Sequence, residues 1–345
     1  MLQFPAGQVS VRTPGDVLAL VPYLLGYHPS DGDLVAVGLR GTALVIAARA
    51  ELPAAGTLRL RITARLDAMA TQLARSGADV AVVIGYAPAQ HLDPVMTAVV
   101  PLITAHGIRV HECLRVSDGR YWSYRCTNSH CCPPEGTAFE PRSTALAAQL
   151  TVAGRVALPN RAAIADRIAP VEGTHCTAMT QATRDAVNQL HQLISAVGAI
   201  TAAAAVVDAG HDAVITAFDR YEAGERLSDD EAAWLIVLLT NTDVRDDAWR
   251  RIDGRDEHLQ LWSDLTRRAE AHLVAAPASL LAFAAWSRGD GALANIAVAR
   301  ALDAVPAYSM GNLIADLLDC GMPPSPLDGR PDAVDAAPDS SPTPA

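Results

Sequence analysis

The sequence predicts an α/β N-terminal domain with a mixed sheet, followed by an all-α, repeat-like C-terminal domain. Up to about residue 126, short apolar runs alternate with segments of helical periodicity, which is typical of a sheet layered with helices. From about residue 143 onward, only helical periodicity continues. We therefore expect an α/β domain over 1–140, a connecting segment over 141–172, a helical domain over 173–322 and a disordered, Pro-, Asp- and Ser-rich tail over 323–345.

The first domain begins with a predicted helix. Thr13 and Asp16 have the spacing of a capping box, and Gly26 provides the stop. The apolar runs 34–39 and 43–50 flank a short Arg-Gly turn and predict a hairpin. The remaining expected elements are a helix over 62–73 ending at Gly77, a strand over 79–86, a helix from Asp93-Pro94 to Gly107, and strands over 108–117 and 120–126.

Six helices are expected in the second domain, over 190–207, 229–240, 256–273, 278–288, 293–304 and 309–318. The last three are joined by short connections, which predicts antiparallel neighbours. Small and bulky residues between Trp286 and Pro306 resemble one degenerate tetratricopeptide unit. An ordinary helical bundle accounts for the same pattern.

Composition excludes several functions. Asp and Glu number 38 against 27 basic residues, so the net charge is −11, which argues against binding to a nucleic-acid backbone. All the basic residues are arginine, and without lysine neither a P-loop nor Schiff-base chemistry is available. No stretch is apolar enough to span a membrane, and the N-terminus does not resemble a signal peptide. We expect a soluble, cytoplasmic protein with no nucleic-acid or membrane partner.

A hairpin near residue 118 organises the candidate chemistry. Asp118-Gly119 between two strand-like runs favours a two-residue turn. Such a turn pairs residues whose numbers sum to 237. The expected pairs include Glu112 with Arg125, Cys113 with Tyr124 and His111 with Cys126.

This hairpin and the loop after it are rich in cysteine and histidine. Zinc takes four Cys or His ligands in tetrahedral geometry, and the sequence offers His111, Cys126, Cys131 and either Cys132 or Cys113. The spacing also fits buried, reduced thiols that only pack, or a redox pair formed by Cys126 and Cys131. The cofactor therefore stays open, with zinc as the candidate.

A second candidate site lies in the segment from Gly26 to Asp33. His28, Asp31 and Asp33 offer a cation site or an acid–base pair in a cleft. The Pro-Ser-Asp-Gly run within the segment favours a simple turn instead.

Two stretches carry a family resemblance. The first stretch is residues 21–29 (VPYLLGYHP) with the strand that follows. The second is Trp122-Ser123-Tyr124 with Cys126, together with the run Cys131 to Gly136 (CCPPEG). Both are similar to a family of uncharacterised proteins from high-GC Gram-positive bacteria. The resemblance extends to Ala285-Trp286 and Gly289-Asp290. The family is a domain of unknown function, so the resemblance implies a bacterial cytoplasmic protein and assigns no site residue.

Three functions follow from these patterns. The first is a binding or interaction protein whose helical domain takes a protein or small-molecule partner. The alternative is a zinc-dependent hydrolase at the Cys/His hairpin, in which Glu135 or His130 acts as the base for a zinc-bound water. The third is nucleotide binding in a crevice at the carboxyl ends of the strands, with Arg in place of Lys for the phosphate. Whether the protein is an enzyme is left open by the sequence.

Overall fold

The computed structural model describes residues 2–4, 7–9, 11–52, 58–322 and 324. The expected tail over 323–345 lies, except for Pro324, outside the described residues. The strands are β1 (Leu2–Phe4), β2 (Gly7–Val9), β3 (Asp33–Arg40), β4 (Ala43–Glu51), β5 (Val80–Tyr86), β6 (Arg109–Ser117), β7 (Arg120–Ser123) and β8 (Thr137–Ala138).

These strands form one sheet in the order β2-β1-β4-β3-β5-β6-β7-β8. Strands β5 and β6 run parallel, while β3 is antiparallel to both of its neighbours, β4 and β5. The hairpin predicted around Arg40-Gly41 is present as β3 and β4. The mixed sheet expected from the sequence is therefore confirmed.

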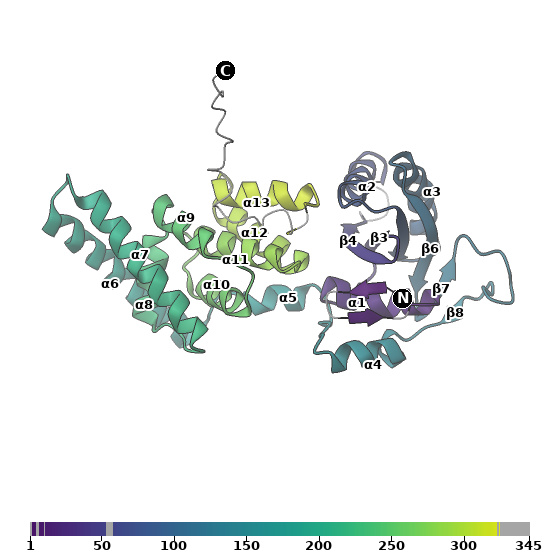
Figure 1. The fold of residues 1–345 in the computed structure, drawn as a ribbon, viewed down its shortest axis with the longest axis horizontal. Helices are drawn as coiled ribbons and strands as arrows, with labels where there is room; N and C mark the ends of the chain where they lie inside the picture. The colour runs from purple at the N-terminus through teal and green to yellow at the C-terminus, as the bar shows by residue number, and fades with distance from the viewer. Residues whose placement is uncertain (1, 5–6, 10, 53–57, 323, 325–345) are drawn as a thin grey trace, which may run out of the picture.

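Helices cover both faces of the sheet (Figure 1). Leu34 and Ala36 of β3 join the apolar core under α2 (Leu58–Arg75) and α3 (Ala89–Ala105). The alternate residues Val35 and Val37 face the opposite core, which contains residues of α1 (Pro14–Leu25). This alternation is the two-residue period of a strand buried on both sides.

Helix α1 has the ends that the sequence predicts. Thr13 and Asp16 form a capping box, and Gly26 takes a left-handed conformation with φ of 76°. The start predicted for α3 at Asp93-Pro94 is wrong, because the helix begins at Ala89. The carbonyl oxygen of Pro88 already accepts the first helical hydrogen bonds, and Pro94 lies inside the helix.

The rest of the chain is helical. The helices are α4 (Ala145–Val152), α5 (Ala162–Arg167), α6 (Gly173–Val197), α7 (Ala202–Glu222), α8 (Asp229–Leu238), α9 (Thr242–Arg250), α10 (Asp256–Arg268), α11 (Ala275–Ser287), α12 (Gly291–Ala304) and α13 (Ser309–Asp319). The single helix expected over 190–207 is wrong. Gly198, with φ of 76°, ends α6, and the chain turns before α7 begins.

The two parts of the molecule share one core. Residues of α1 and β3 belong to the same buried apolar cluster as residues of α5 and of the later helices. In Figure 1, α5 lies between the sheet and the main group of helices. At a second contact, the side chain of Gln72 on α2 donates hydrogen bonds to the carbonyl oxygens of Leu318 and Asp319.

Two expectations about the helices have different outcomes. The all-helical second part is confirmed, whereas the resemblance to a tetratricopeptide unit stays a prediction. Among the described residues, none of the helices combines the length and apolar character needed to cross a bilayer.

Candidate functional site

The Asp118-Gly119 hairpin is confirmed. Both turn residues have positive φ, 50° for Asp118 and 69° for Gly119, as a two-residue turn of this kind requires. The paired residues run from Ser117 with Arg120 to Leu114 with Ser123, so their numbers sum to 237 as predicted. Arg115 and Trp122 form one of these pairs, and the Arg115 guanidinium carbon lies 3.7 Å from the centre of the Trp122 ring.

Beyond Tyr124 the predicted pairing is wrong. One further hydrogen bond, from the Tyr124 N–H to the Cys113 carbonyl oxygen, continues the ladder, and β7 then ends. The Ser123 hydroxyl oxygen accepts hydrogen bonds from the backbone N–H groups of Arg125 and Cys126, at 3.1 and 2.9 Å. These N–H groups are thereby turned away from β6.

The Ser123 side chain also binds Glu112, the residue that the sequence pairs with Arg125. Its hydroxyl group donates to Glu112 Oε1 at 2.9 Å, and the same oxygen accepts the Cys113 N–H at 2.8 Å. The expected Glu112–Arg125 and His111–Cys126 pairs do not form, because the chain has left the ladder at this point.

His111 and Cys113 lie outside the loop that carries the other cysteines. His111 is the extra residue of a β-bulge: Val110 pairs with Ala81 and Glu112 with Val82. Its side chain is exposed, whereas Cys113 is buried in the core beneath α2 and α3. Burial raises the pKa of the Cys113 thiol to about 11, which keeps it protonated.

The other three candidate cysteines, Cys126, Cys131 and Cys132, lie in the loop between β7 and β8, which projects beyond the sheet edge (Figure 1). Asn128 organises its first half. The Asn128 side-chain oxygen accepts the His130 N–H at 2.9 Å, and its backbone oxygen accepts the N–H groups of Cys131 and Cys132 at 3.2 and 2.9 Å. This local turn brings the chain back towards Cys126.

The result is a cluster of three thiols, Cys126, Cys131 and Cys132, whose sulfur atoms all lie within 4.8 Å of one another. Cys126 Sγ is 3.0 Å from Cys131 Sγ, and Cys131 Sγ is 3.8 Å from Cys132 Sγ. Within the described parts of the chain this is the one group of three or more His, Cys, Asp or Glu side chains close enough to hold an ion together. We call it the thiol cluster.

Hydrogen bonding within the thiol cluster shifts the pKa values of the three thiols in different directions. The thiols of Cys131 and Cys132 stabilise the Cys126 thiolate and lower the pKa of Cys126. The pKa of Cys131 is raised, chiefly by its hydrogen bond with Cys126. Burial, followed by the same neighbours, raises the pKa of Cys132 to about 12. The hydrogen bonds from Cys131 and Cys132 therefore favour a thiolate at Cys126.

The spacing of the thiol cluster suits a soft metal ion. With zinc–sulfur bonds of about 2.3 Å, two sulfur ligands of a tetrahedral ion lie about 3.8 Å apart. The Cys131–Cys132 separation already has this value, and the Cys126–Cys131 contact would have to open by about 0.8 Å. Adjacent cysteines seldom ligate one ion together, yet here the turn at Asn128 places both sulfurs on the same side as Cys126.

A model of a protein family, described as a domain of unknown function (DUF4192), matches residues 14–325. The chain belongs to this family. Its matched region includes the thiol cluster and every helix from α1 to α13. No curated protein and no solved structure matches the chain. The family membership fits the resemblance seen in the sequence and leaves the chemistry to be argued from the residues.

The second candidate site, around His28, is a turn. Two hydrogen bonds of 3.0 Å close this turn: the Ser30 N–H donates to the Asp33 carboxylate, and the Asp33 N–H donates to the Ser30 carbonyl oxygen. Asp33 is buried and paired with Arg49, whose Nε lies 2.6 Å from Asp33 Oδ1. Its carboxylate therefore has a structural partner, while Asp31 is exposed.

Two residues that shape the chain around the thiol cluster, Ser123 at the end of β7 and Asn128 in the loop, were missed by sequence reasoning. Ser123 ends the strand and Asn128 turns the chain, and both do so through side-chain hydrogen bonds to nearby backbone N–H groups. Ser and Asn after a strand are a signal for such turns. That signal could have indicated that the pairing stops before Cys126.

Proposed function

We propose that the protein binds one zinc ion through Cys126, Cys131 and Cys132. The observation that supports this proposal is the distance of at most 4.8 Å between any two of the three sulfur atoms. Three thiolates supply three of the four positions of tetrahedral zinc and leave the fourth to water or to an outside ligand.

A binding or structural role fits these ligands better than hydrolysis. A zinc ion with three thiolates has a net charge of −1, so it acidifies a bound water less than an ion held by neutral imidazoles does. Hydrolysis would also need a base, and the candidates His130 and Glu135 are both exposed on the same loop. Zinc-dependent hydrolysis is therefore the second choice for this site.

Metal analysis of the purified, reduced protein tests the proposal. We expect about one zinc per chain in the wild type and a loss of most of it in Cys126→Ser and in Cys132→Ser, because two thiolates bind zinc far more weakly than three. Cys176→Ser is the matched control, since Cys176 is an exposed cysteine on α6, outside the thiol cluster. Circular dichroism should show that all the variants are folded.

Two results would contradict a zinc site. One is wild-type protein that binds no zinc under reducing conditions, even after incubation with the metal. The other is equal zinc content in Cys126→Ser and Cys176→Ser. A disulfide between Cys126 and Cys131 in protein purified without reductant, together with no zinc uptake after reduction, would favour the redox interpretation.

We also propose that the helical domain has a binding role. A cavity of about 330 Å³ supports this, since it lies against α10, the end of α5 and the beginning of α12. Binding of any small molecule there, detected by NMR shifts confined to these helices, tests the proposal. A cavity that takes up no small molecule would leave the helical domain without a demonstrated ligand site.

A further inference from the structure

The cavity at α10 combines apolar walls with polar groups. Leu158 from the connecting segment, Ile164 of α5 and Leu259 of α10 contribute apolar surface, while Gln260 and Ser263 add neutral polar groups. Its volume of about 330 Å³ is in the range of sites that take small molecules.

Three arginines line this cavity: Arg167 at the end of α5, Arg226 between α7 and α8, and Arg267 on α10. Within the part of the chain that the structure describes, the guanidinium groups of Arg167 and Arg267 make neither a hydrogen bond nor an ion pair. A chain with a net charge of −11 thus gathers three positive groups from separate elements around one hollow. Guanidinium groups suit carboxylates and phosphates because they donate two parallel hydrogen bonds.

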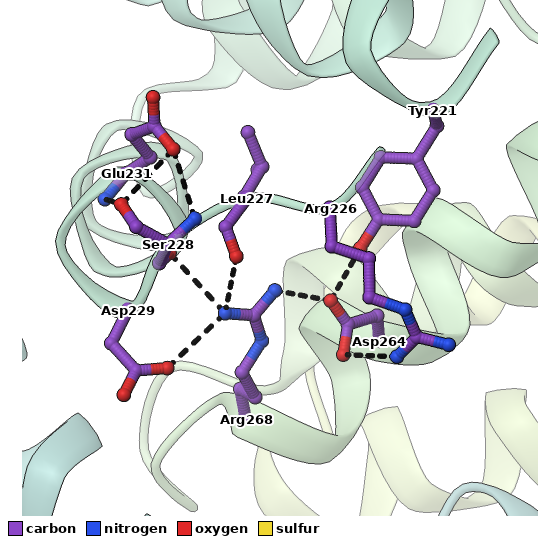
Figure 2. Close-up of polar contacts among 8 residues, drawn as sticks. All are labelled: Tyr221, Arg226, Leu227, Ser228, Asp229, Glu231, Asp264 and Arg268. Carbon is purple, nitrogen blue, oxygen red and sulfur yellow. Dashed lines mark hydrogen bonds and ion pairs between the residues drawn. The ribbon is translucent and has the colours of Figure 1, made fainter. Parts of the chain in front are cut away.

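One carboxylate at the cavity, Asp264, is already engaged. Figure 2 shows that it accepts hydrogen bonds from the Tyr221 hydroxyl and the Arg268 guanidinium, while Arg226 lies 3.9 Å away. Arg268 is nearly buried and also donates to the carbonyl oxygens of Leu227 and Ser228. The negative charge of Asp264 is therefore offset by Arg268 and Arg226, both in the helical domain.

Asp290 is the other carboxylate of the cavity, and it serves as a helix cap. One of its oxygens accepts the Leu293 N–H at 3.0 Å at the start of α12. The charged residues that line the cavity are three arginines and two aspartates, and the Arg226 guanidinium lies near Asp264. The cavity therefore has an excess of positive charge.

We propose that this cavity binds a small organic anion. Arg167 and Arg267 bind its carboxylate or phosphate group, and its apolar body lies against Leu158, Ile164 and Leu259. This ligand class specifies the binding role proposed above for the helical domain, and it rests on that role. It is independent of zinc binding at the thiol cluster.

Three probes with the same six-carbon chain test the proposal by calorimetry: hexyl phosphate, hexanoate and neutral 1-hexanol. We expect at least one of the two anions to bind the full-length protein, and Arg167→Gln/Arg267→Gln to weaken that binding by about tenfold or more. Arg184→Gln is the matched control, because Arg184 is an exposed arginine of α6 that does not line the cavity. It should bind as the wild type does. Preference for hexyl phosphate over hexanoate, or the reverse, identifies the anionic group.

The neutral probe separates this inference from the broader binding role. If 1-hexanol binds as tightly as the anions, or if the double variant binds them as the wild type does, the anion proposal is wrong and the cavity is an apolar site. If none of the three probes binds, both the anion proposal and the use of this cavity fail.

Discussion

The indole N–H of Trp122 donates a hydrogen bond to the carbonyl oxygen of Pro134 across 3.0 Å. This bond joins the two ends of the loop that carries the thiol cluster, because Trp122 follows the β7–β8 pairing on one side and Pro134 precedes it on the other. Arg120 adds a second tie through its 2.8 Å hydrogen bond to the Gly136 carbonyl oxygen. The loop is thus closed at its base, which limits the volume that its cysteines can occupy.

Trp122→Phe should weaken zinc binding. The substitution removes one hydrogen bond, worth about 1 kcal/mol, from the closed form of the loop, which corresponds to about fivefold in affinity. Competition with a chromophoric chelator measures the zinc affinity. The control is Trp286→Phe, which removes an indole hydrogen bond to Met322 from another part of the fold. Equal zinc affinities for the two variants would contradict the role given to Trp122.

Gly136→Ala should destabilise the same loop. Gly136 has φ of 79°, and a Cβ there would lie 2.4 Å from the Trp122 ring. Gly107→Ala is a matched control, since Gly107 has φ of 78° and open space around the added Cβ. Both variants carry about 1 kcal/mol of left-handed strain, and only Gly136→Ala also displaces the indole. We expect zinc affinity to fall in Gly136→Ala alone; loss of zinc in both would show that the contact is irrelevant.

Zinc affinity should rise with pH. The ion binds thiolates, and the pKa values of Cys131 and Cys132 are raised, so binding must displace their protons. Lowering the pH from about 8 to about 6 should therefore weaken binding, and proton release on zinc addition should be measurable in a weakly buffered solution. An affinity that does not change with pH would mean that thiolates are not the ligands.

Arg49→Leu should destabilise the fold strongly. The side chain of Asp33 is 3% exposed, and Arg49 is its ion-pair partner. Removing Arg49 leaves a buried carboxylate without an ion-pair partner, which costs about 3 kcal/mol. Urea denaturation should show this loss, and the double variant Asp33→Asn/Arg49→Leu should recover part of it. A double variant no more stable than Arg49→Leu would show that the unpaired carboxylate is not the cause.

His258 should make stability depend on pH. Burial lowers the pKa of His258, whose ring packs 4.6 Å from that of Phe218, centre to centre. Asp253 and Glu222 face the imidazole and favour its charged form, while Arg255 opposes it, and burial outweighs them. As the pH falls through the unfolded-state pKa of about 6.5, the unfolded chain gains a proton that the folded chain does not, so stability falls.

Denaturation at pH 8 and at pH 5.5 measures this dependence. His258→Gln should reduce the difference in stability between the two pH values. His272→Gln, at a side chain that is 69% exposed, should retain it. The same pH difference in both variants would exclude His258 as the source.

Where local signals were strong, the sequence predicted the structure well. The capping box at Thr13, the Asp118-Gly119 turn and the run from Val80 to Tyr86 each determine a conformation within a few residues, and each element is present. The predictions failed where a neighbouring side chain or a single glycine interrupted a periodic pattern. Ser123 ended a strand, and Gly198 divided a helix that periodicity alone had made continuous.

By itself, the sequence determined the α/β order of the first part, the helical nature of the second and the hairpin register up to Ser123, because these depend on short-range periodicity and turn chemistry. Only the tertiary structure decided which cysteines meet. The hydrogen bonds of Ser123 and the turn at Asn128 bring Cys126, Cys131 and Cys132 together, away from His111 and Cys113. No regular alternation of residues predicts these hydrogen bonds. The tertiary structure also decided that the three cavity arginines meet. They come from three segments distant along the chain, and these segments must pack before the arginine side chains lie together.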